Sequence, residues 1–349
     1  MPRRSASSRL AATFTRAAQR NLKTFTQATL RSSKKVVTQV QRAVAKQHEP
    51  PTGDGEWLAG TAIGPAGVRR YHLFKPAGLV LQRGEKRPLL VMLHGCGQQG
   101  RDFAESTRMN RLAARERCLV LYPEQDRMAN VQGCWNWYEL RSGKAVAEAA
   151  TLMAMVDQVV MLQGADRQRV AVAGLSAGAS MAALLVSRYP SRFQAVAMHS
   201  GVAPGAASSS ATALGAMRGQ QGMANAAAAV GQLQGVNLPP LLVIHGETDR
   251  VVAASNGRTS AAVWALASGA APGPERVLQR GKRYATRVTD YKRKGKVQVS
   301  LHQIEQLGHA WSGGPAKLAF SDANGPDATR LVWSFVARQF KNVPVPAKA

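Results

Sequence analysis

The chain has 349 residues, of which 45% are hydrophobic, so it can bury the core of one large α/β domain with extensions. Its formal net charge is +26 and its isoelectric point is about 11.1, which indicates an anionic partner such as nucleic acid or an anionic surface. No window approaches the ~18 apolar residues of a membrane-spanning helix. The three cysteines, Cys96, Cys118 and Cys134, are too few for a disulfide scaffold and favour a reducing compartment.

Residues 1–48 carry eleven Lys or Arg and no Asp or Glu, and they lack the apolar run of an export signal. At about 100° per residue, the following mostly apolar side chains share one face: Leu10, Phe14, Ala18, Leu22, Phe25, Thr29, Val36, Val40 and Val44. The pattern predicts a basic amphipathic helical arm suited to the surface of an apolar phase. A helix docked on its own domain, a frayed arm and an organellar transit peptide have similar compositions. Nucleic acid is disfavoured as a partner because its binding needs no apolar stripe.

Residues 49–55 are a predicted linker, and residues 56–343 a single domain in which strands and helices alternate. Strands are expected at 56–63 and 68–75 (an antiparallel hairpin), 88–93, 118–122, 170–173, 193–198 and 241–244, with a basic pair at 284–291 and 297–304. Helices are expected at 101–115, 145–162, 181–188, 253–267 and 325–340. This order predicts an α/β fold with a mostly parallel central sheet and helices on both faces. Residues 203–237, rich in Ala, Gly, Ser and Gln, are predicted to be a loop-and-helix insertion over the site.

The most informative stretch is Gly174-Leu-Ser-Ala-Gly178, which joins a β-branched strand to a helix-forming run. Strand, Gly-x-Ser-x-Gly and helix in this order are typical of the nucleophile elbow of α/β-hydrolases. The glycines are expected because side chains beside such a tight turn would collide with the adjoining strand and helix. Ser176 is therefore the candidate nucleophile, and the following helix N-terminus favours an oxyanion beside it.

A serine nucleophile needs a histidine base that is held in one tautomer by a carboxylate. In the order of this fold, Asp249 is the candidate acid and His309 the candidate base, because each follows a predicted strand in a short turn. Glu247 is the competing carboxylate. The other histidines considered fit less well, because His245 and His302 lie within predicted strands and His199 is better explained as a structural hydrogen-bonding residue.

The segment Leu93-His94-Gly-Cys-Gly-Gln98 follows the third predicted strand, where these enzymes place the amides that bind the developing oxyanion. The expected donors are the backbone N–H groups of Cys96 and Ala177. The spacings CxxC and HExxH do not occur, and neither a metal nor an organic cofactor is expected.

Together with Cys134-Trp-Asn-Trp137, Gly308-His-Ala-Trp-Ser-Gly-Gly314 and Gly325-Pro-Asp-Ala-Thr-Arg330, these motifs resemble the polyhydroxybutyrate depolymerase family of esterases over roughly residues 55–341. The resemblance implies a serine esterase acting on poly- or oligo-(3-hydroxyalkanoates). It assigns nucleophile, acid and base to Ser176, Asp249 and His309. Feruloyl, acetyl-xylan and short-chain carboxylesterases share these motifs and remain the alternative within the enzyme class.

The resemblance also gives roles to residues near the site. Trp135, Trp137 and Trp311 are candidate surfaces for an aliphatic polyester, with core packing as the alternative. Cys96 and Cys134 lie in two of the motifs and could form a disulfide, although a cytosolic location argues against it. The chain shows neither the signal peptide nor the substrate-binding domain of secreted relatives, so an intracellular, cytoplasmic protein is expected. The arm would then attach it to polymer granules, and a binding protein that acts through this arm is the alternative of another class.

Overall fold

The computed structural model describes residues 50–78, 85–220 and 223–343, so the predicted arm over residues 1–48 lies outside the described part of the chain. The described part contains an eleven-stranded sheet in the order β1-β2-β4-β3-β5-β6-β7-β11-β10-β8, with β9 also paired to β10. The strands are β1 (Gly55–Gly64), β2 (Gly67–Pro76), β3 (Arg87–Leu93), β4 (Leu119–Pro123), β5 (Ala165–Leu175), β6 (Ala195–His199), β7 (Leu241–Gly246), β8 (Ala271–Pro272), β9 (Arg276–Leu278), β10 (Thr286–Arg293) and β11 (Lys296–Ile304). Strands β4, β3, β5, β6, β7 and β11 run parallel, as the alternating pattern predicted.

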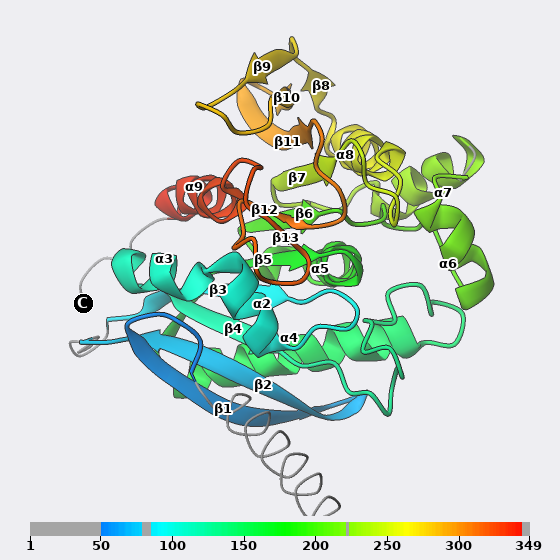
Figure 1. Cartoon of the computed structure of the whole chain (residues 1–349). Coiled ribbons are helices and arrows are strands. Elements are labelled where there is room, and N and C mark those ends of the chain that lie inside the picture. The colour runs from blue at the N-terminus through cyan, green and yellow to red at the C-terminus, as the bar shows by residue number, and fades with distance from the viewer. Residues whose placement is uncertain (1–49, 79–84, 221–222, 344–349) are drawn as a thin grey trace, which may run out of the picture. The chain divides into compact units, whose positions relative to one another are not determined.

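Helices cover both faces of this sheet (Figure 1). One face carries α2 (Gly100–Thr107), α3 (Met109–Glu116) and α9 (Ala328–Lys341). The other carries α4 (Lys144–Leu162), α5 (Ala177–Arg188) and α8 (Ser255–Ser268). The central strands are apolar on both sides because both sides are covered. In β3, Leu89, Val91 and Leu93 belong to the core under α4 and α5, whereas Leu90 and Met92 belong to the core under α2, α3 and α9.

The predicted antiparallel hairpin is present as β1 and β2, which pair from Gly55 with Pro76 to Gly64 with Gly67. The helix expected over 101–115 is instead two helices, and this prediction was wrong. Arg108 adopts a left-handed conformation, with φ of 54°, which ends α2 and starts α3 in a new direction. Its guanidinium reaches the Gly313 carbonyl, far along the chain. A tertiary contact of this kind leaves no local signal.

The remaining elements are short or lie outside the central sheet. A 3₁₀ turn, η1 (Pro190–Arg192), precedes β6, and a small sheet pairs β12 (Trp311–Ser312) with β13 (Ser321–Asp322). The predicted insertion contains α6 (Ser210–Met217) and α7 (Met223–Leu233). The Ala253 N–H donates to the Met217 carbonyl, which ties α6 to the turn before α8. That the insertion covers the site stays a prediction.

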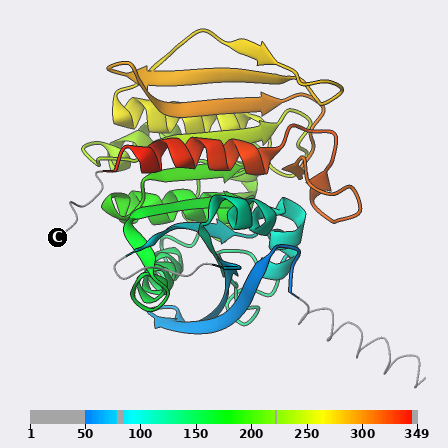
Figure 2. The ribbon, with the colours of Figure 1, turned by 90° about the vertical axis from the view of Figure 1, so that its left-hand side faces the viewer.

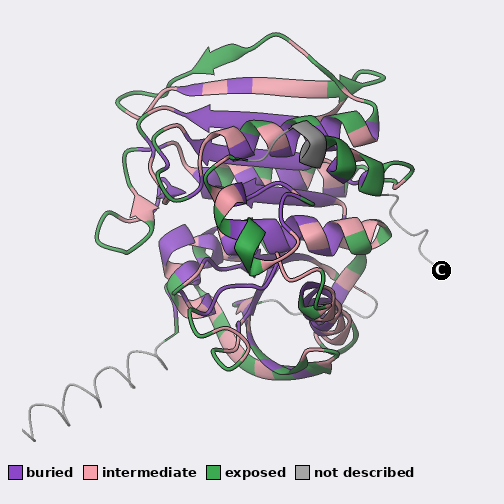
Figure 3. Cartoon of the chain, turned by 90° about the vertical axis from the view of Figure 1, so that its right-hand side faces the viewer, coloured by how far each residue is buried: buried purple, intermediate pink, exposed green. Residues whose placement is uncertain are grey.

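The sequence predicts no window of membrane-spanning character, and this expectation is corrected by α4, which is, among the described residues, the one helix long and apolar enough to cross a membrane by length and composition. Half of its most apolar window is buried inside the protein, where it packs against β1, β5 and α5. Figure 2 looks onto the face of the sheet that carries α9, and Figure 3 shows that the strands of the central sheet are mostly buried. The apolar character of α4 is therefore explained by its place in the core.

Candidate active site

The turn between β5 and α5 holds Ser176 in an unusual backbone conformation. Its φ is 56° and its ψ is −121°, a region that non-glycine residues occupy only when the surrounding structure enforces it. The Ser176 N–H donates to the His199 carbonyl at 2.9 Å, and the Ser176 carbonyl accepts from the Ala179 and Ser180 N–H groups at 3.0 and 3.1 Å. This strained strand-to-helix turn has the geometry of a nucleophile elbow.

The two flanking glycines are required by close backbone contacts. A Cβ at Gly174 would overlap the backbone of Gly178, and a Cβ at Gly178 would overlap the carbonyl oxygens of Leu93 and His94. The sequence-based reason for the Gly-x-Ser-x-Gly pattern is therefore confirmed. The elbow is packed directly on the end of β3, which also begins the segment proposed to bind the oxyanion.

Replacing Gly178 by alanine is expected to lower the free energy of unfolding by about 3 kcal/mol, because backbone atoms must move to make room. The matched control is Gly231→Ala on α7, where an added Cβ meets nothing within 4 Å. It is expected to leave stability unchanged or to raise it by up to about 1 kcal/mol. Urea denaturation of both variants measures the difference. Equal stability of the two would contradict the close approach at the elbow.

His309 and Asp249 meet at the same edge of the sheet, after β11 and β7 respectively. The imidazole Nδ1 lies 2.8 Å from Asp249 Oδ2, and the other carboxylate oxygen accepts from the Val251 and Val252 N–H groups, each at 2.9 Å. Burial favours a higher pKa for Asp249, but the hydrogen bond and charge of His309 and the Val252 N–H outweigh it and lower this pKa. The ionised carboxylate fixes the proton on Nδ1 and leaves Nε2 as the free base nitrogen.

The competing residues have other partners. Glu247 forms an ion pair with Arg287, so its carboxylate is engaged away from His309. His245 is buried, and its Nε2 contacts the Val252 carbonyl at 2.9 Å. His302 is hydrogen-bonded to Ser300, outside this cluster. His245 Nε2 also lies 3.6 Å from Asp249 Oδ2, but the shorter contact, at 2.8 Å, is the one between that oxygen and His309 Nδ1.

His199 joins the elbow to the loop that carries His309. Its carbonyl accepts from the Ser176 N–H, and its Nε2 accepts from the Ser312 N–H at 3.2 Å. Its ring also stacks on Trp311, with centroids 5.1 Å apart. The structural role predicted for His199 agrees with these contacts. Among the described residues, His309 is hydrogen-bonded to Asp249, and no hydrogen bond joins its ring to the Ser176 hydroxyl. In enzymes of this type the bond between the base and the nucleophile often forms or shortens only when substrate binds.

The segment after β3 passes beside the nucleophile. A Cβ at Gly95 would lie 3.5 Å from the Ser176 Cβ. The Gly95 N–H donates to Gln98 Oε1 at 3.0 Å, and the Gly97 N–H donates to the Gln132 carbonyl at 2.9 Å. Neither the Cys96 nor the Ala177 N–H has an acceptor among the described residues, so both amides are available to an incoming oxyanion.

A disulfide joins Cys96 to Cys134 and ties this segment to the loop that follows β4. The sequence makes this disulfide possible, with a reducing cytosolic location as the argument against it. Its presence removes the support that the cysteine count gave to a reducing compartment. Cys118 is free and buried, as expected for a core residue.

Sequence reasoning missed the buried carboxylate that supports this loop. Glu148 on α4 accepts from the Gln125 and Asn136 side chains at 2.7 and 2.6 Å and from the Asn136 N–H at 2.8 Å. Gln125 in turn donates to the Cys134 carbonyl at 2.9 Å. The available signal was an acidic residue in the alanine-rich first half of α4, whose other acidic residue is Asp157, and Asn136 lies within one of the quoted motifs.

Peptide mapping without reductant is expected to recover Cys96 and Cys134 in one cross-linked peptide pair and Cys118 as a free thiol. The measurement is mass spectrometry after alkylation of the folded and of the denatured protein. Cys118 should be alkylated only after denaturation because it is buried. Alkylation of Cys96 or Cys134 without prior reduction would contradict the disulfide.

The prediction that three tryptophans present their faces to substrate does not hold in this structure. Trp135 and Trp311 are each 1% exposed and Trp137 is 8% exposed. The Trp135 indole N–H donates to the His94 carbonyl and that of Trp311 to Thr329 Oγ1, each at 3.0 Å. Rings so enclosed have no face left for a substrate. Their role here is to pack and orient the loops around the site.

The buried histidines predict a loss of stability in acid. Burial lowers the pKa of His94 to about 4 and that of His199 to about 3, where the neighbouring His245 and His309 contribute further. Below about pH 6.5 these histidines bind protons in the unfolded chain, whereas in the folded protein they stay neutral. Each should therefore reduce the free energy of unfolding by about 1.4 kcal/mol per pH unit as pH falls toward 4. Glu124, whose pKa burial raises to about 7, acts in the opposite direction, but histidines outnumber it.

Urea denaturation followed by tryptophan fluorescence between pH 6.5 and 4.5 measures this effect. His199→Phe keeps an aromatic ring against Trp311 and should give a shallower dependence on pH than the parent chain. A free energy of unfolding that rises as pH falls would show that these histidines are not held neutral.

Comparison with known proteins places these features in a family. The family model described as Esterase PHB depolymerase matches residues 69–270. Poly(3-hydroxyalkanoate) depolymerase C of Paucimonas lemoignei is 33% identical over 48% of this chain and 42% of its own length. Feruloyl esterase B of Neurospora crassa is 32% identical over 40% of this chain and 46% of its own length. The aligned segments thus span less than half of either relative.

A solved structure shares the fold. The acetyl xylan esterase from Aspergillus awamori superimposes with a TM-score of 0.60 over 72% of this chain and 94% of its own, at 19% sequence identity. This likeness bears out the α/β-hydrolase fold that the sequence predicted. The family match covers more than half of the chain, including β5, the elbow and β7. The chain belongs to the esterase family described by the name PHB depolymerase.

Proposed function

We propose that this protein is a serine esterase that hydrolyses poly- or oligo-(3-hydroxyalkanoates). The observation that carries the proposal is the cluster formed by a strained Ser176 elbow, the His309–Asp249 hydrogen bond and two unclaimed amides at one edge of the sheet. The substrate class is supported by the family and by the similarity to a poly(3-hydroxyalkanoate) depolymerase.

The mechanism follows from the roles these groups can fill. His309 takes the Ser176 proton on Nε2 while Oγ attacks the ester carbonyl, and Asp249 stabilises the resulting imidazolium. The Cys96 and Ala177 amides bind the oxyanion, and removal of one such donor typically costs 10²–10³-fold in turnover. The alcohol end of the chain leaves with the proton from His309. Water then attacks the acyl-enzyme, again with His309 as the base, and releases the hydroxyacyl product.

The runner-up is a carbohydrate esterase, because feruloyl and acetylxylan esterases are also among the similar proteins. The deciding experiment measures kcat/KM on amorphous polyhydroxybutyrate and its oligomers, on feruloylated xylan and on acetylated xylan, with one enzyme preparation. The proposal expects the polyester to be the preferred substrate. Faster release of ferulate or acetate from xylan would assign the chain to the runner-up.

We further propose that the basic arm, residues 1–48, attaches the enzyme to polymer granules. The support is its apolar stripe beside eleven cations, which suits an apolar surface that carries anionic groups. A chain that lacks residues 1–48 should hydrolyse p-nitrophenyl butyrate normally and remain in the supernatant when granules are sedimented. Unchanged sedimentation with granules would show that attachment lies elsewhere.

A further inference from the structure

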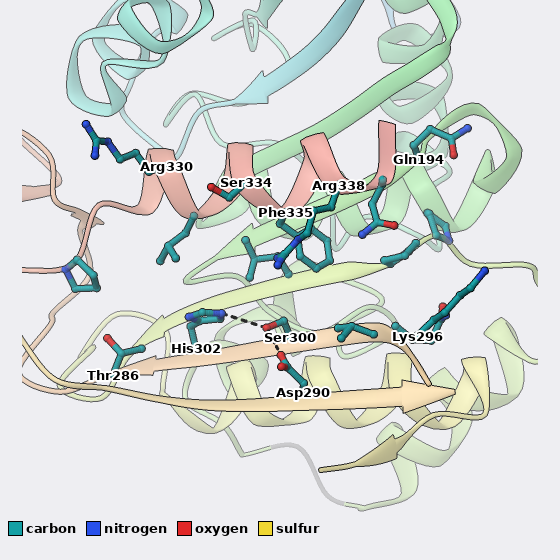
Figure 4. Close-up of a pocket in the computed structure, with 18 of the residues that line it drawn as sticks. Gln194, Thr286, Asp290, Lys296, Ser300, His302, Arg330, Ser334, Phe335 and Arg338 are labelled. Atoms are coloured by element: carbon teal, nitrogen blue, oxygen red, sulfur yellow. Dashed lines mark hydrogen bonds between the residues drawn. The ribbon is translucent and has the colours of Figure 1, made fainter. Parts of the chain in front are cut away.

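A groove of about 1680 Å³ lies apart from the candidate active site, between α9 on one side and β10 and β11 on the other (Figure 4). Its lining does not include Ser176, Asp249 or His309. Helix α9 packs over β5, β6 and β7, and no helix among the described residues covers the part of this sheet face formed by β11 and β10. The proposed esterase chemistry therefore gives this groove no role.

Along β11, polar and apolar residues alternate, as expected of a strand with one face in the core and one face toward an open groove. Its residues Val299 and Leu301 are buried in the core that includes α8. The alternate residues, Lys296, Gln298, Ser300 and His302, line the groove. A strand covered on both faces would be apolar on both, as β3 is. Ser300 and His302 are buried and hydrogen-bonded to each other, so Lys296 and Gln298 are the residues of this face that meet water or a polar ligand.

Cations dominate the lining of the groove. It contains eight Lys or Arg residues and two acidic residues. The two acidic residues pair with cations of the same lining, because Asp290 binds Arg276 at 2.7 Å and Asp327 lies 3.6 Å from Arg330 Nε while it caps α9 through the Arg330 backbone N–H. The lining therefore keeps an excess of positive charge over the paired residues. The cations come from several elements and stand on opposite walls, as Lys296 and Arg338 in Figure 4 illustrate. Charges spread along two walls suit an extended anion better than a single small one.

The groove also contains Ser300, His302 and Asp290 in contact, but their hydrogen bonds exclude a second hydrolytic centre. The Ser300 hydroxyl donates its proton to Asp290 Oδ1 at 2.6 Å, because an ionised carboxylate can only accept. His302 Nε2 lies 3.1 Å from Ser300 Oγ. Because the serine proton is already used, His302 must donate its own N–H to this hydroxyl oxygen. A histidine that donates to the serine cannot take its proton. Burial also lowers the pKa of His302 to about 4, so its ring is neutral at pH 7.

Neutral hydrogen-bonding groups accompany the cations. Amide side chains of five residues belong to the lining: Gln194, Asn237, Gln298, Gln339 and Asn342. Thr286, 4% exposed, has a buried hydroxyl with no partner among the described residues. Amides and hydroxyls can bond base edges and sugars as well as phosphate oxygens, so this lining offers contacts that a strand of nucleic acid would use and that inorganic polyphosphate does not require. The recessed shape also disfavours a membrane surface.

We propose that this groove binds a single strand of nucleic acid, with phosphates along its cationic walls and bases or sugars against its amide and hydroxyl groups. This assignment goes beyond the proposed esterase function. It also differs from the sequence-based expectation, which considered nucleic acid only for the arm and disfavoured it there. The reason is that the groove cations come from separate segments, from Arg108 to Lys341, and only the fold collects them.

The test uses the full chain, a fluorescein-labelled oligothymidylate and fluorescence anisotropy. The double variant Lys296→Gln/Arg338→Gln removes one cation from each wall. It should bind the oligonucleotide about 20-fold more weakly at 0.1 M salt. The slope of the logarithm of the binding constant against the logarithm of salt concentration should become shallower by about 1.4, because each of the two lost phosphate contacts contributes about 0.7. The matched control, Arg111→Gln/Arg218→Gln, removes two exposed cations outside the groove and should bind as the parent does.

Both double variants should hydrolyse p-nitrophenyl butyrate at the parental rate, which shows that the fold is intact. Equal affinities of the groove and control variants would overturn the proposal. Competition by inorganic polyphosphate as strong as that by unlabelled oligothymidylate, at equal phosphate concentration, would overturn the nucleic-acid assignment in favour of polyphosphate.

A second readout separates the groove from the basic arm. Irradiation of the full chain with a strand containing 5-iodouracil should cross-link Tyr284, a half-buried aromatic residue of the groove lining, and mass spectrometry should find the adduct there. Cross-links confined to residues 1–49 would place all binding on the arm and overturn the proposal. The two readouts do not depend on which ester the enzyme cleaves.

Discussion

Replacement of Ser176 by alanine is expected to lower kcat for p-nitrophenyl butyrate by roughly 10⁵- to 10⁶-fold, to the residual rate that binding and the oxyanion amides support. The physical reason is that no other hydroxyl lies on the strained turn between β5 and α5, where a helix N-terminus and two unclaimed amides meet. The measurement is steady-state hydrolysis with the alanine variant and the parent purified side by side.

The fold should survive this change, because the backbone partners of residue 176 are unchanged and Cβ is retained. Thermal unfolding of the variant supplies the control. Ser180→Ala, one turn further along α5, is the matched variant and should keep kcat within a few-fold, since its hydroxyl accepts from the Val202 N–H and donates to the Ser176 carbonyl at 3.4 Å but is not hydrogen-bonded to Ser176 Oγ in the described part of the chain. Retention of most activity by Ser176→Ala would show that the nucleophile lies elsewhere.

Asp249→Asn is expected to reduce kcat by about 10⁴-fold while leaving the structure in place. An asparagine amide can donate to His309 Nδ1 and so favours the tautomer in which Nε2 carries the proton and cannot act as a base. A pH–rate profile of the variant should show partial recovery at high pH, where a hydroxide ion or a deprotonated nucleophile no longer needs the imidazole.

Glu247→Gln is the matched control for this change, because it lies two residues earlier on the same turn and its carboxylate pairs with Arg287. It should keep kcat within a few-fold of the parent and cost at most about 1 kcal/mol in stability, as expected for a partly exposed ion pair. A larger loss of kcat from Glu247→Gln than from Asp249→Asn would exchange the roles of the two residues.

The elbow and the sheet were predictable because their signals are local. Close backbone contacts leave only glycine at Gly174 and Gly178, and burial on both faces leaves only apolar residues in the buried part of β3, from Leu89 to Leu93. The choice between Asp249 and Glu247 was less secure from sequence. Both follow the same strand, and what separates them is Arg287, which the fold brings from a different strand.

What the sequence could not supply depends on contacts between distant segments. The break at Arg108 accompanies a contact with Gly313. Glu148 supports the loop that follows β4 through the side chains of Gln125 and Asn136. The tryptophan prediction failed for a related reason. A motif can show that an aromatic ring lies near a site, but only the packing shows whether the ring faces the site or the core.

The contacts of His199 have a consequence for how the family can change its specificity. One residue holds the backbone of the nucleophile through its carbonyl and the strand after the base through its ring. Serine and imidazole therefore share a single brace on β6, independent of the chain between 203 and 237. If that chain covers the site, as the sequence predicts, insertions and deletions in it would reshape the substrate pocket without misaligning the two reacting groups, which is the condition for one catalytic frame to serve several kinds of ester.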